Sequence, residues 1–282
     1  MKNGIMIETN NEYHSDLSAI SKSRLANMSV CPQYFKWAFD NPQEPTTDLI
    51  FGSAFHKFVL EKDGFGEEFA VLPKDIDRRT KVGKELYNQF LDNNVGKQII
   101  TQDEFDQIFD MKASVFSNEY AEKLLNGHHE ESMYFEDELT NITCKIRPDC
   151  YKVIGDKVII TDLKSCKSAM PEDFMRDIVK YSYDLQAYMY RLGVAKTLNV
   201  PIENVSFVFI CCEKKEPYLT AIYEVTQDIF DRGEMLFRKY IGMLKYCTDT
   251  NNWYGINGHT HEPMTIGLPE WAKSKENSNK GE

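Results

Sequence analysis

Apolar residues recur about every 3.6 positions in residues 78–91 and 103–125, which is the spacing of amphipathic helices. The segment 51–60 (FGSAFHKFVL) is apolar on most faces, so it is predicted to be a buried helix. We expect helices over residues 22–28, 33–39, 51–60, 78–91 and 103–125.

The pattern changes near residue 133, where β-branched and aromatic residues alternate with polar ones or form short runs. Gly155-Asp156 separates two of these runs and predicts a hairpin turn. We therefore expect an antiparallel meander. Its predicted strands are residues 133–135, 142–146, 151–154 and 157–163.

Helices and strands then alternate to residue 245. Pro171 fits the first position of a helix that runs, with interruptions, to Leu198. Strands are expected at 205–212 and 218–225, and a closing helix at 227–245. This order predicts an α/β fold, with a mixed central sheet flanked by helices and a helical N-terminal region.

The 282 residues suffice for one large core, so we expect a single domain over residues 1–272. Within it, 65–128 is predicted to be a helical insertion and 129–225 the catalytic sheet core. The polar tail 273–282 (KSKENSNKGE) is expected to be disordered.

No apolar run approaches the roughly 20 residues of a membrane-spanning helix, and the N-terminus lacks the apolar stretch of a secretory signal. We therefore expect a cytoplasmic protein with no membrane partner. The seven cysteines are odd in number and contain no C-x-x-C, so neither a disulfide framework nor a zinc finger is expected.

The formal net charge of −11 argues against a passive coat on nucleic acid, but an enzyme can bind DNA through a local basic patch. Arg78, Arg79 and Lys81 form the densest basic cluster, and Lys180 is a further candidate. Cations at a helix start oppose the helix dipole, which indicates a phosphate partner. The alternative is a solvated helix start.

Two short motifs carry the candidate chemistry. Arg147-Pro148-Asp149 precedes the predicted turn and Asp162-Leu163-Lys164 follows it, so a hairpin brings the two aspartates together. Asp162 and Lys164 are two apart on a strand and share a face. Two carboxylates and an ammonium group at one strand end suit metal-assisted phosphodiester hydrolysis, with the Leu163 carbonyl as a further ligand. The alternative is an ordinary solvated Asp and Lys.

Two other features add to this site. His56 lies on the apolar helix, and Gln186 and Tyr190 are four apart on one face of a later helix. Taken singly, a core histidine and a half-buried aromatic helix are the better interpretations. Their combination with the two aspartates favours a functional site.

In this order, the motifs resemble the RecB-like branch of the PD-(D/E)XK nucleases, and most closely the RecE-like phage and prophage exonucleases (the exonuclease VIII catalytic domain). The resemblance covers about two thirds of the chain. It rests on I-S-K-S (Ile20 to Ser23), F-G-x-A-x-H (Phe51 to His56), R-P-D (Arg147 to Asp149), D-L-K (Asp162 to Lys164) and K-Y-x-Y-x-x-Q-x-x-x-Y (Lys180 to Tyr190).

The resemblance implies a restriction-endonuclease-like core and a set of site residues. His56, Asp149 and Asp162 would be metal ligands, and Lys164 the catalytic lysine. Gln186 and Tyr190 would position the strand or order the site. An additional acidic residue is expected ahead of the sheet, where Glu130 is favoured over Glu131; one slip in strand register would exchange them.

The hydroxyl and guanidinium groups of Ser21, Ser23 and Arg24 are candidates for holding a terminal 5′ phosphate. Ser21 also fits the N-cap of the helix that follows it, which is the competing interpretation.

The resemblance further implies a Mg²⁺-dependent 5′-to-3′ exonuclease, with Mn²⁺ as a substitute, that leaves 3′ overhangs on double-stranded DNA ends for recombination. Such enzymes form rings, trimers or tetramers, and work with a RecT-like single-strand annealing protein in a phage-infected or lysogenic bacterium. The alternatives are a restriction-type or flap endonuclease and an inactive DNA-binding module.

Two further cofactors are not expected. Cys31-Pro32 is similar to the start of an iron–sulfur nuclease motif, but only Cys247 lies near the other end of the chain, so no cluster is predicted. No Walker A motif occurs, so no nucleotide is expected.

Overall fold

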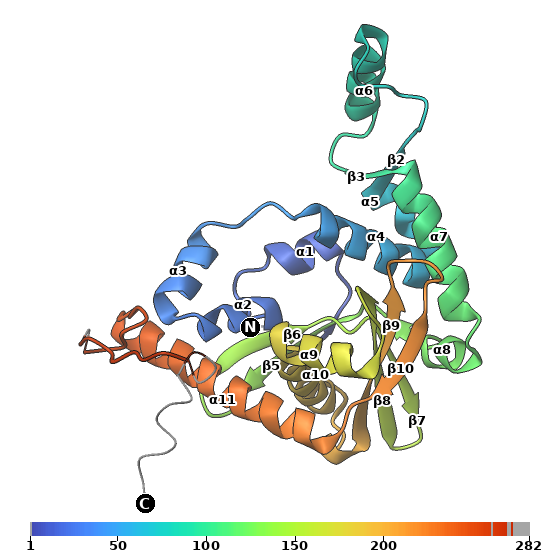
Figure 1. The fold of residues 1–282 in the computed structure, drawn as a ribbon. Helices are drawn as coiled ribbons and strands as arrows, with labels where there is room; N and C mark the ends of the chain where they lie inside the picture. The colour runs from blue at the N-terminus through green and yellow to red at the C-terminus, as the bar shows by residue number, and fades with distance from the viewer. Residues whose placement is uncertain (1, 261, 270–271, 273–282) are drawn as a thin grey trace, which may run out of the picture.

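The computed structural model describes residues 2–260, 262–269 and 272; the tail predicted to be disordered lies outside these residues. A five-stranded sheet forms the centre of the fold (Figure 1). β8 and β9 are parallel and the other neighbouring strands are antiparallel, so the predicted mixed α/β sheet is confirmed. Its order is β10 (Thr220–Glu224), β9 (Val205–Glu213), β8 (Lys157–Cys166), β7 (Cys150–Ile154) and β4 (His128–His129).

A second sheet holds β1 (Gly4–Met6), β5 (Ser132–Asp137) and β6 (Ile142–Ile146). The prediction of one continuous meander is therefore wrong between β6 and β7, which belong to different sheets. The chain leaves this second sheet after β6, at Arg147-Pro148. Proline has no N–H to donate to a ladder, so it favours this change of sheet.

Helices cover both faces of the central sheet. On one face α10 (Tyr183–Leu198) packs against β9, β5 and β6 and against α11 (Gln227–Thr250), with α9 (Pro171–Lys180) beside it. On the other face α4 (Thr47–Leu60) and α7 (Gln102–Phe116) contact β8 and β9. Alternate strand residues enter the two cores, Phe209 the first and Ile210 the second, as the period of two requires.

The segment 65–128 is less helical than predicted. It contains α5 (Phe65–Glu68), α6 (Lys81–Asn93), α7 and α8 (Glu119–Leu124), but also a parallel pair, β2 (Phe69–Leu72) and β3 (Gln98–Thr101). This pair forms the base of an arm, and α6 projects from it away from the body (Figure 1). A short 3-10 turn, η2 (Lys62–Gly64), precedes α5. None of the described helices is long and apolar enough to cross a membrane.

The N-terminal region consists of α1 (Asn10–Ser15), α2 (Lys22–Ala26), a 3-10 turn η1 (Asn27–Ser29) and α3 (Pro32–Asp40); a later 3-10 turn, η3 (Ile202–Asn204), leads into β9. A buried lysine attaches α1 to the second sheet. Lys145, on β6, is 1% exposed, and its Nζ donates to the backbone carbonyls of Tyr13 and, at 2.8 Å, Asp16. Because Tyr13 and His14 form part of a cavity wall described below, Lys145 helps to shape that wall.

We expect Lys145→Met to destabilise the fold by about 2 kcal/mol, because two buried carbonyls lose their donor while the apolar stem is retained. Chemical denaturation monitored by circular dichroism measures the change in the free energy of unfolding. Lys157→Met, at an exposed position in β8, is the control and should lie within about 0.5 kcal/mol of the parent. Equal stabilities of the two variants would contradict this role of Lys145.

Candidate metal centre

The β7–β8 hairpin places the two predicted motifs side by side. Ile154 pairs with Lys157, which leaves Gly155-Asp156 as the turn, and Gly155 has the positive φ of 64° that favours glycine. At the other end Cys150 pairs with Thr161, so Asp149 and Asp162 both lie just beyond this pair. The predicted hairpin is confirmed, and the Leu163 N–H donates to Asp149 Oδ2 at 2.7 Å.

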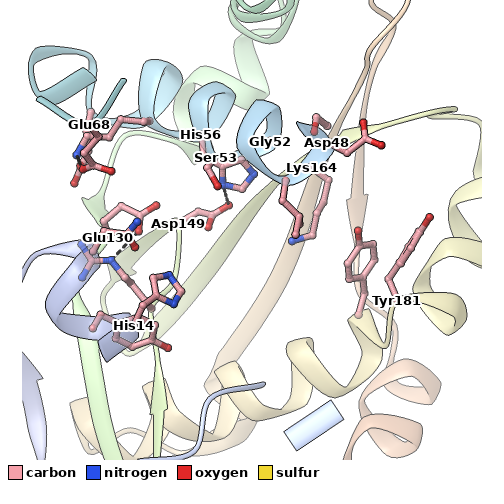
Figure 2. A pocket seen from close by; sticks show the side chains of 18 of the residues that line it. His14, Asp48, Gly52, Ser53, His56, Glu68, Glu130, Asp149, Lys164 and Tyr181 are labelled. Carbon is pink, nitrogen blue, oxygen red and sulfur yellow. Dashed lines mark hydrogen bonds and ion pairs between the residues drawn. The ribbon is translucent and has the colours of Figure 1, made fainter. Parts of the chain in front are cut away.

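Three side chains converge at this strand end from three parts of the chain. His56 comes from α4, Glu130 from the turn before β5, and Asp149 from the segment before β7; one potential ligand atom of each lies within 4.8 Å of the others (Figure 2). His56 Nδ1 is 3.2 Å from Asp149 Oδ2.

The structure brings Glu130, and not Glu131, into this cluster. Glu130 has a φ of 51°, a left-handed conformation that turns the chain sharply before β5. Glu131 instead accepts a hydrogen bond from the Tyr151 hydroxyl at 2.5 Å and lies 3.1 Å from His128 Nδ1. Of the two adjacent acids, Glu130, which the sequence favours, is therefore the one that joins His56 and Asp149.

Asp162 lies beside the three-residue cluster and is not one of its members. Its oxygens are occupied by Lys164 Nζ at 2.5 and 2.7 Å and by Gln186 Nε2 at 2.9 Å. The structure thus brings together Asp162, Lys164 and Gln186, as the motifs suggest. That Asp162 binds a metal stays a prediction, because ligation requires it to release one of these donors.

Burial and neighbouring charges shift the acid–base properties of the cluster. Burial, reinforced by Asp149, raises the pKa of Glu130 to about 7. Burial also raises the pKa of Asp162 to about 6, although Lys164 opposes this shift. Burial alone would raise the pKa of Asp149, but His56 and Lys164 outweigh it and the pKa lies below its ordinary value.

Lys164 remains a cation in this setting. Burial alone would lower its pKa, but attraction to Asp162 and Asp149 outweighs this effect, so the pKa of Lys164 lies above its ordinary value. Its Nζ lies 4.8 Å from the centre of the Tyr183 ring. Tyr190, also predicted for the site, lines the same cavity; burial raises its pKa, so its phenol stays neutral.

The donor set of His56, Glu130 and Asp149 fits a divalent cation. Two carboxylate oxygens and one imidazole nitrogen lie within reach of one ion. Burial and the Asp149 charge both raise the pKa of Glu130, and a nearby cation would favour its ionised form. Carboxylate oxygens favour Mg²⁺ or Mn²⁺, and imidazole is compatible with Mn²⁺ and other transition metals.

The cluster opens into a cavity of about 540 Å³. His14 and Tyr13 of α1 form one wall, and α4 forms another (Figure 2). Lys164, Ser165 and the junction between α9 and α10 form the side opposite α1. The three potential ligands and Lys164 all line this cavity.

Most of the predicted DNA-binding residues lie apart from the cavity. The Ser21 and Ser23 hydroxyls are 3.1 Å apart, and Arg24 reaches the His14 carbonyl at 3.4 Å; among the described residues, these three do not line the cavity. Ser21 occupies the N-cap position of α2 but its side chain makes no capping hydrogen bond. Lys180 lies 4.8 Å from the centre of the Tyr181 ring, near the cavity edge.

The basic cluster predicted at 78–81 lies on the projecting arm (Figure 1). Arg79 forms two hydrogen bonds with the Asp77 carboxylate, at 2.9 and 3.0 Å, and Arg78 stacks on Tyr87. The structure therefore does not bring this cluster to the metal centre. A DNA path that uses it must extend beyond the cavity.

Sequence reasoning assigned no role to Arg147, which the structure places beside the cluster. Its Nε donates to Glu130 Oε2 at 2.9 Å, and its terminal nitrogen donates to Ser132 Oγ at 2.8 Å. Arg147 thus fixes the position of a potential ligand. The sequence feature that points to Arg147 is its place in the R-P-D motif, two residues before Asp149.

The mixed central sheet flanked by helices is that of the PD-(D/E)XK fold. Residues 21–261 match the family described as "PDDEXK-like domain of unknown function (DUF3799)", and the chain belongs to this family. A search among curated proteins gave no match.

Two solved structures are similar in fold. A protein described as "Putative exonuclease" from Eubacterium rectale is 15% identical, with a TM-score of 0.59; the match covers 94% of this chain and 97% of the other. A structure of SSO0001 is 14% identical, covers 81% of each chain and has a TM-score of only 0.36. The first likeness shows a shared fold over nearly the whole chain.

Proposed function

We propose that this protein is a metal-dependent 5′-to-3′ exonuclease that degrades one strand of linear double-stranded DNA and leaves 3′ overhangs for recombination. The observation that carries the proposal is the cluster of His56, Glu130 and Asp149 beside Lys164 in one open cavity. The polarity and the preference for ends rest on the motif resemblance to RecE-like enzymes. The description of the Eubacterium rectale protein as "Putative exonuclease" supports the preference for ends.

His56, Glu130 and Asp149 would hold the cation, which we propose to be Mg²⁺ with Mn²⁺ as a substitute. A cation bound there supplies polarisation of the scissile phosphate and a lower pKa for a bound water. Arg147 holds Glu130 in place, and the Leu163 N–H holds Asp149. These contacts give the ligands fixed positions before substrate binds.

Lys164 would donate to a phosphoryl oxygen as negative charge develops during the attack on phosphorus. Its charge is maintained by Asp162, which Gln186 in turn orients through a 2.9 Å hydrogen bond. Asp162 and Gln186 therefore act on the substrate through Lys164 in this arrangement.

The test is digestion of linear and closed circular duplex DNA in Mg²⁺, Mn²⁺ or EDTA, with a label on either the 5′ or the 3′ end of one strand. Early release of 5′ labels from linear DNA, intact circles, and no reaction in EDTA are expected. Rapid nicking of circles would instead indicate the endonuclease alternative. No cleavage in any metal, although DNA binds, would indicate an inactive binding module.

We also expect the basic cluster on the arm to contribute a salt-dependent grip on DNA. Each phosphate contact releases counterions, so Arg78→Ala/Arg79→Ala should flatten the slope of log affinity against log salt by up to about two units. Arg79 contributes less of this if it stays paired with Asp77. Binding is measured by anisotropy in Ca²⁺ from 50 to 300 mM salt.

The control for the arm variant is Lys157→Ala/Lys239→Ala, which removes the same charge at exposed positions outside the arm. This control should keep the slope of the parent protein. An unchanged slope in the arm variant would mean that the DNA path avoids the arm.

The partners remain proposals that rest on the resemblance: a homo-oligomer, ring-shaped with three or four copies, and a RecT-like annealing protein. Val82 and Leu86, one turn apart on α6, are 65% and 44% exposed, which supports a protein partner for the arm. Sedimentation of the parent protein and of Val82→Asp/Leu86→Asp tests this. A single monomeric species for both would contradict the oligomer.

A further inference from the structure

The junction between α9 and α10 places two tyrosine rings at the cavity beside Lys164. Tyr181 and Tyr183 flank Ser182, which has a left-handed φ of 54°, and their ring centres are 5.6 Å apart with an angle of 36° between the planes. Both residues line the cavity, and Tyr181 points toward the region of Lys164 and Asp48 (Figure 2). Tyr181 is 46% exposed.

The backbone of this junction is held from the N-terminal region. Lys22 Nζ donates to the Tyr181 carbonyl at 2.8 Å. The ammonium groups of Lys22 and Lys164 lie 5.5 and 4.8 Å from the centre of the Tyr183 ring, which also packs near Phe209. Tyr183 is therefore fixed, and it supports Tyr181. The Lys180 ammonium group lies 4.8 Å from the centre of the Tyr181 ring, and Tyr181 still exposes 46% of its surface.

The first turn of α4 forms the other side of this part of the cavity (Figure 2). Leu49 in this turn lines the cavity and is 61% exposed. The neighbouring Asp48 carboxylate is paired with Lys214 Nζ at 2.8 Å, so its negative charge is offset. An exposed aliphatic side chain and an exposed aromatic ring thus share a cavity with a buried ammonium group.

We propose that Tyr181, with Leu49 across the cavity, forms a subsite for an unpaired nucleobase next to the phosphate that Lys164 contacts. Every nucleobase has a flat π-face, so an aromatic ring binds any base by stacking and does not select a sequence. A base can enter this subsite only when it is not paired, so the duplex end would separate before cleavage. This inference rests on the proposed nuclease function.

The probe is a forked DNA duplex whose three 5′-terminal nucleotides are unpaired, with fluorescent 2-aminopurine at each of these positions in turn. Binding is measured in Ca²⁺ to limit turnover. We expect the parent protein to quench 2-aminopurine at one position by stacking. Tyr181→Ala should lose this quenching and bind roughly tenfold more weakly, whereas Tyr181→Phe should keep both properties.

Steady-state cleavage in Mg²⁺ separates this subsite from the metal centre. Tyr181→Ala should raise KM more than it lowers kcat, because the ring contacts a base and not the reacting phosphate. Tyr120→Ala is the matched control, since Tyr120 lies on α8 outside this cavity and is 73% exposed. It should match the parent protein in quenching, affinity and KM.

Each outcome distinguishes the inference from the proposed function. If the parent protein binds and cleaves DNA but Tyr181→Ala quenches and binds as the parent does, the base subsite is refuted and the nuclease proposal stands. If the parent protein neither binds nor cleaves any DNA, both are refuted. Loss of quenching in Tyr181→Ala together with its retention in Tyr181→Phe supports the subsite.

Discussion

Asp149→Ala is expected to lower metal-dependent DNA cleavage by roughly 10³-fold or more, because it removes the central member of the cluster. The Asp149 carboxylate lies 3.2 Å from His56 Nδ1 and accepts a hydrogen bond from the Leu163 N–H at 2.7 Å. The substitution therefore removes a proposed ligand together with its contacts to His56 and to β8. Single-turnover cleavage of end-labelled linear duplex in Mg²⁺ measures the loss, and calorimetry with Mn²⁺ measures the metal affinity.

Asp156→Ala is the control for this variant, because Asp156 lies in the turn at the far end of the same hairpin. It removes an equal charge and should leave cleavage unchanged. We expect Asp149→Ala to be slightly less stable than the parent protein, since the lowered pKa of Asp149 means that its ionised form is stabilised in the fold. Cleavage at the parent rate by Asp149→Ala would refute the assignment of the metal centre.

The strands around the site could be predicted because each lies in a short apolar run bounded by turn residues. β6 begins and ends where the sequence predicts, and the Gly155-Asp156 turn fixes the β7–β8 register. The proximity of Asp149 and Asp162 followed from that register alone. This part of the site is local in sequence, so local patterns suffice to find it.

Other elements could not be read from the sequence because their stability comes from distant partners. β2 and β3 have four residues each, and they pair in parallel across the intervening α6. β4 has two residues, too few for any periodicity. The change of sheet at Pro148 was visible as a proline, but the pattern does not show that β5, which pairs with β6 on one side, pairs with β1 on the other.

The membership of the candidate metal-binding cluster could be predicted from the sequence only in part. His56 and Glu130 reach Asp149 from separate elements, so the motif resemblance suggested them and spacing did not. The left-handed backbone at Glu130 decides which of two adjacent acids points inward, and no sequence pattern encodes it. Whether Asp162 binds a metal or remains with Lys164 and Gln186 depends on competition between charges in a buried space.

Lys164→Ala addresses that competition. We expect a fall in kcat of about 10² to 10³-fold, the effect of losing one donor to a developing oxyanion, with metal affinity equal to or above that of the parent protein. The affinity is retained because an ammonium group does not ligate a cation and because a bound cation would no longer be repelled by the positive charge of Lys164. Single-turnover rates at saturating DNA, with calorimetry for Mn²⁺, separate the two effects.

Lys167→Ala is the control for this last variant, because Lys167 is an exposed lysine three positions further along the chain and outside the cavity lining. It should keep the turnover and metal affinity of the parent protein. If Lys164→Ala lost metal affinity but kept turnover, Lys164 would be organising the ligands and not assisting the chemical step. If Lys164→Arg kept most of the parent rate, a positive charge at this position would be sufficient. If Lys164→Arg were as slow as Lys164→Ala, the compact ammonium group of lysine, placed between Asp162 and the substrate, would also be required.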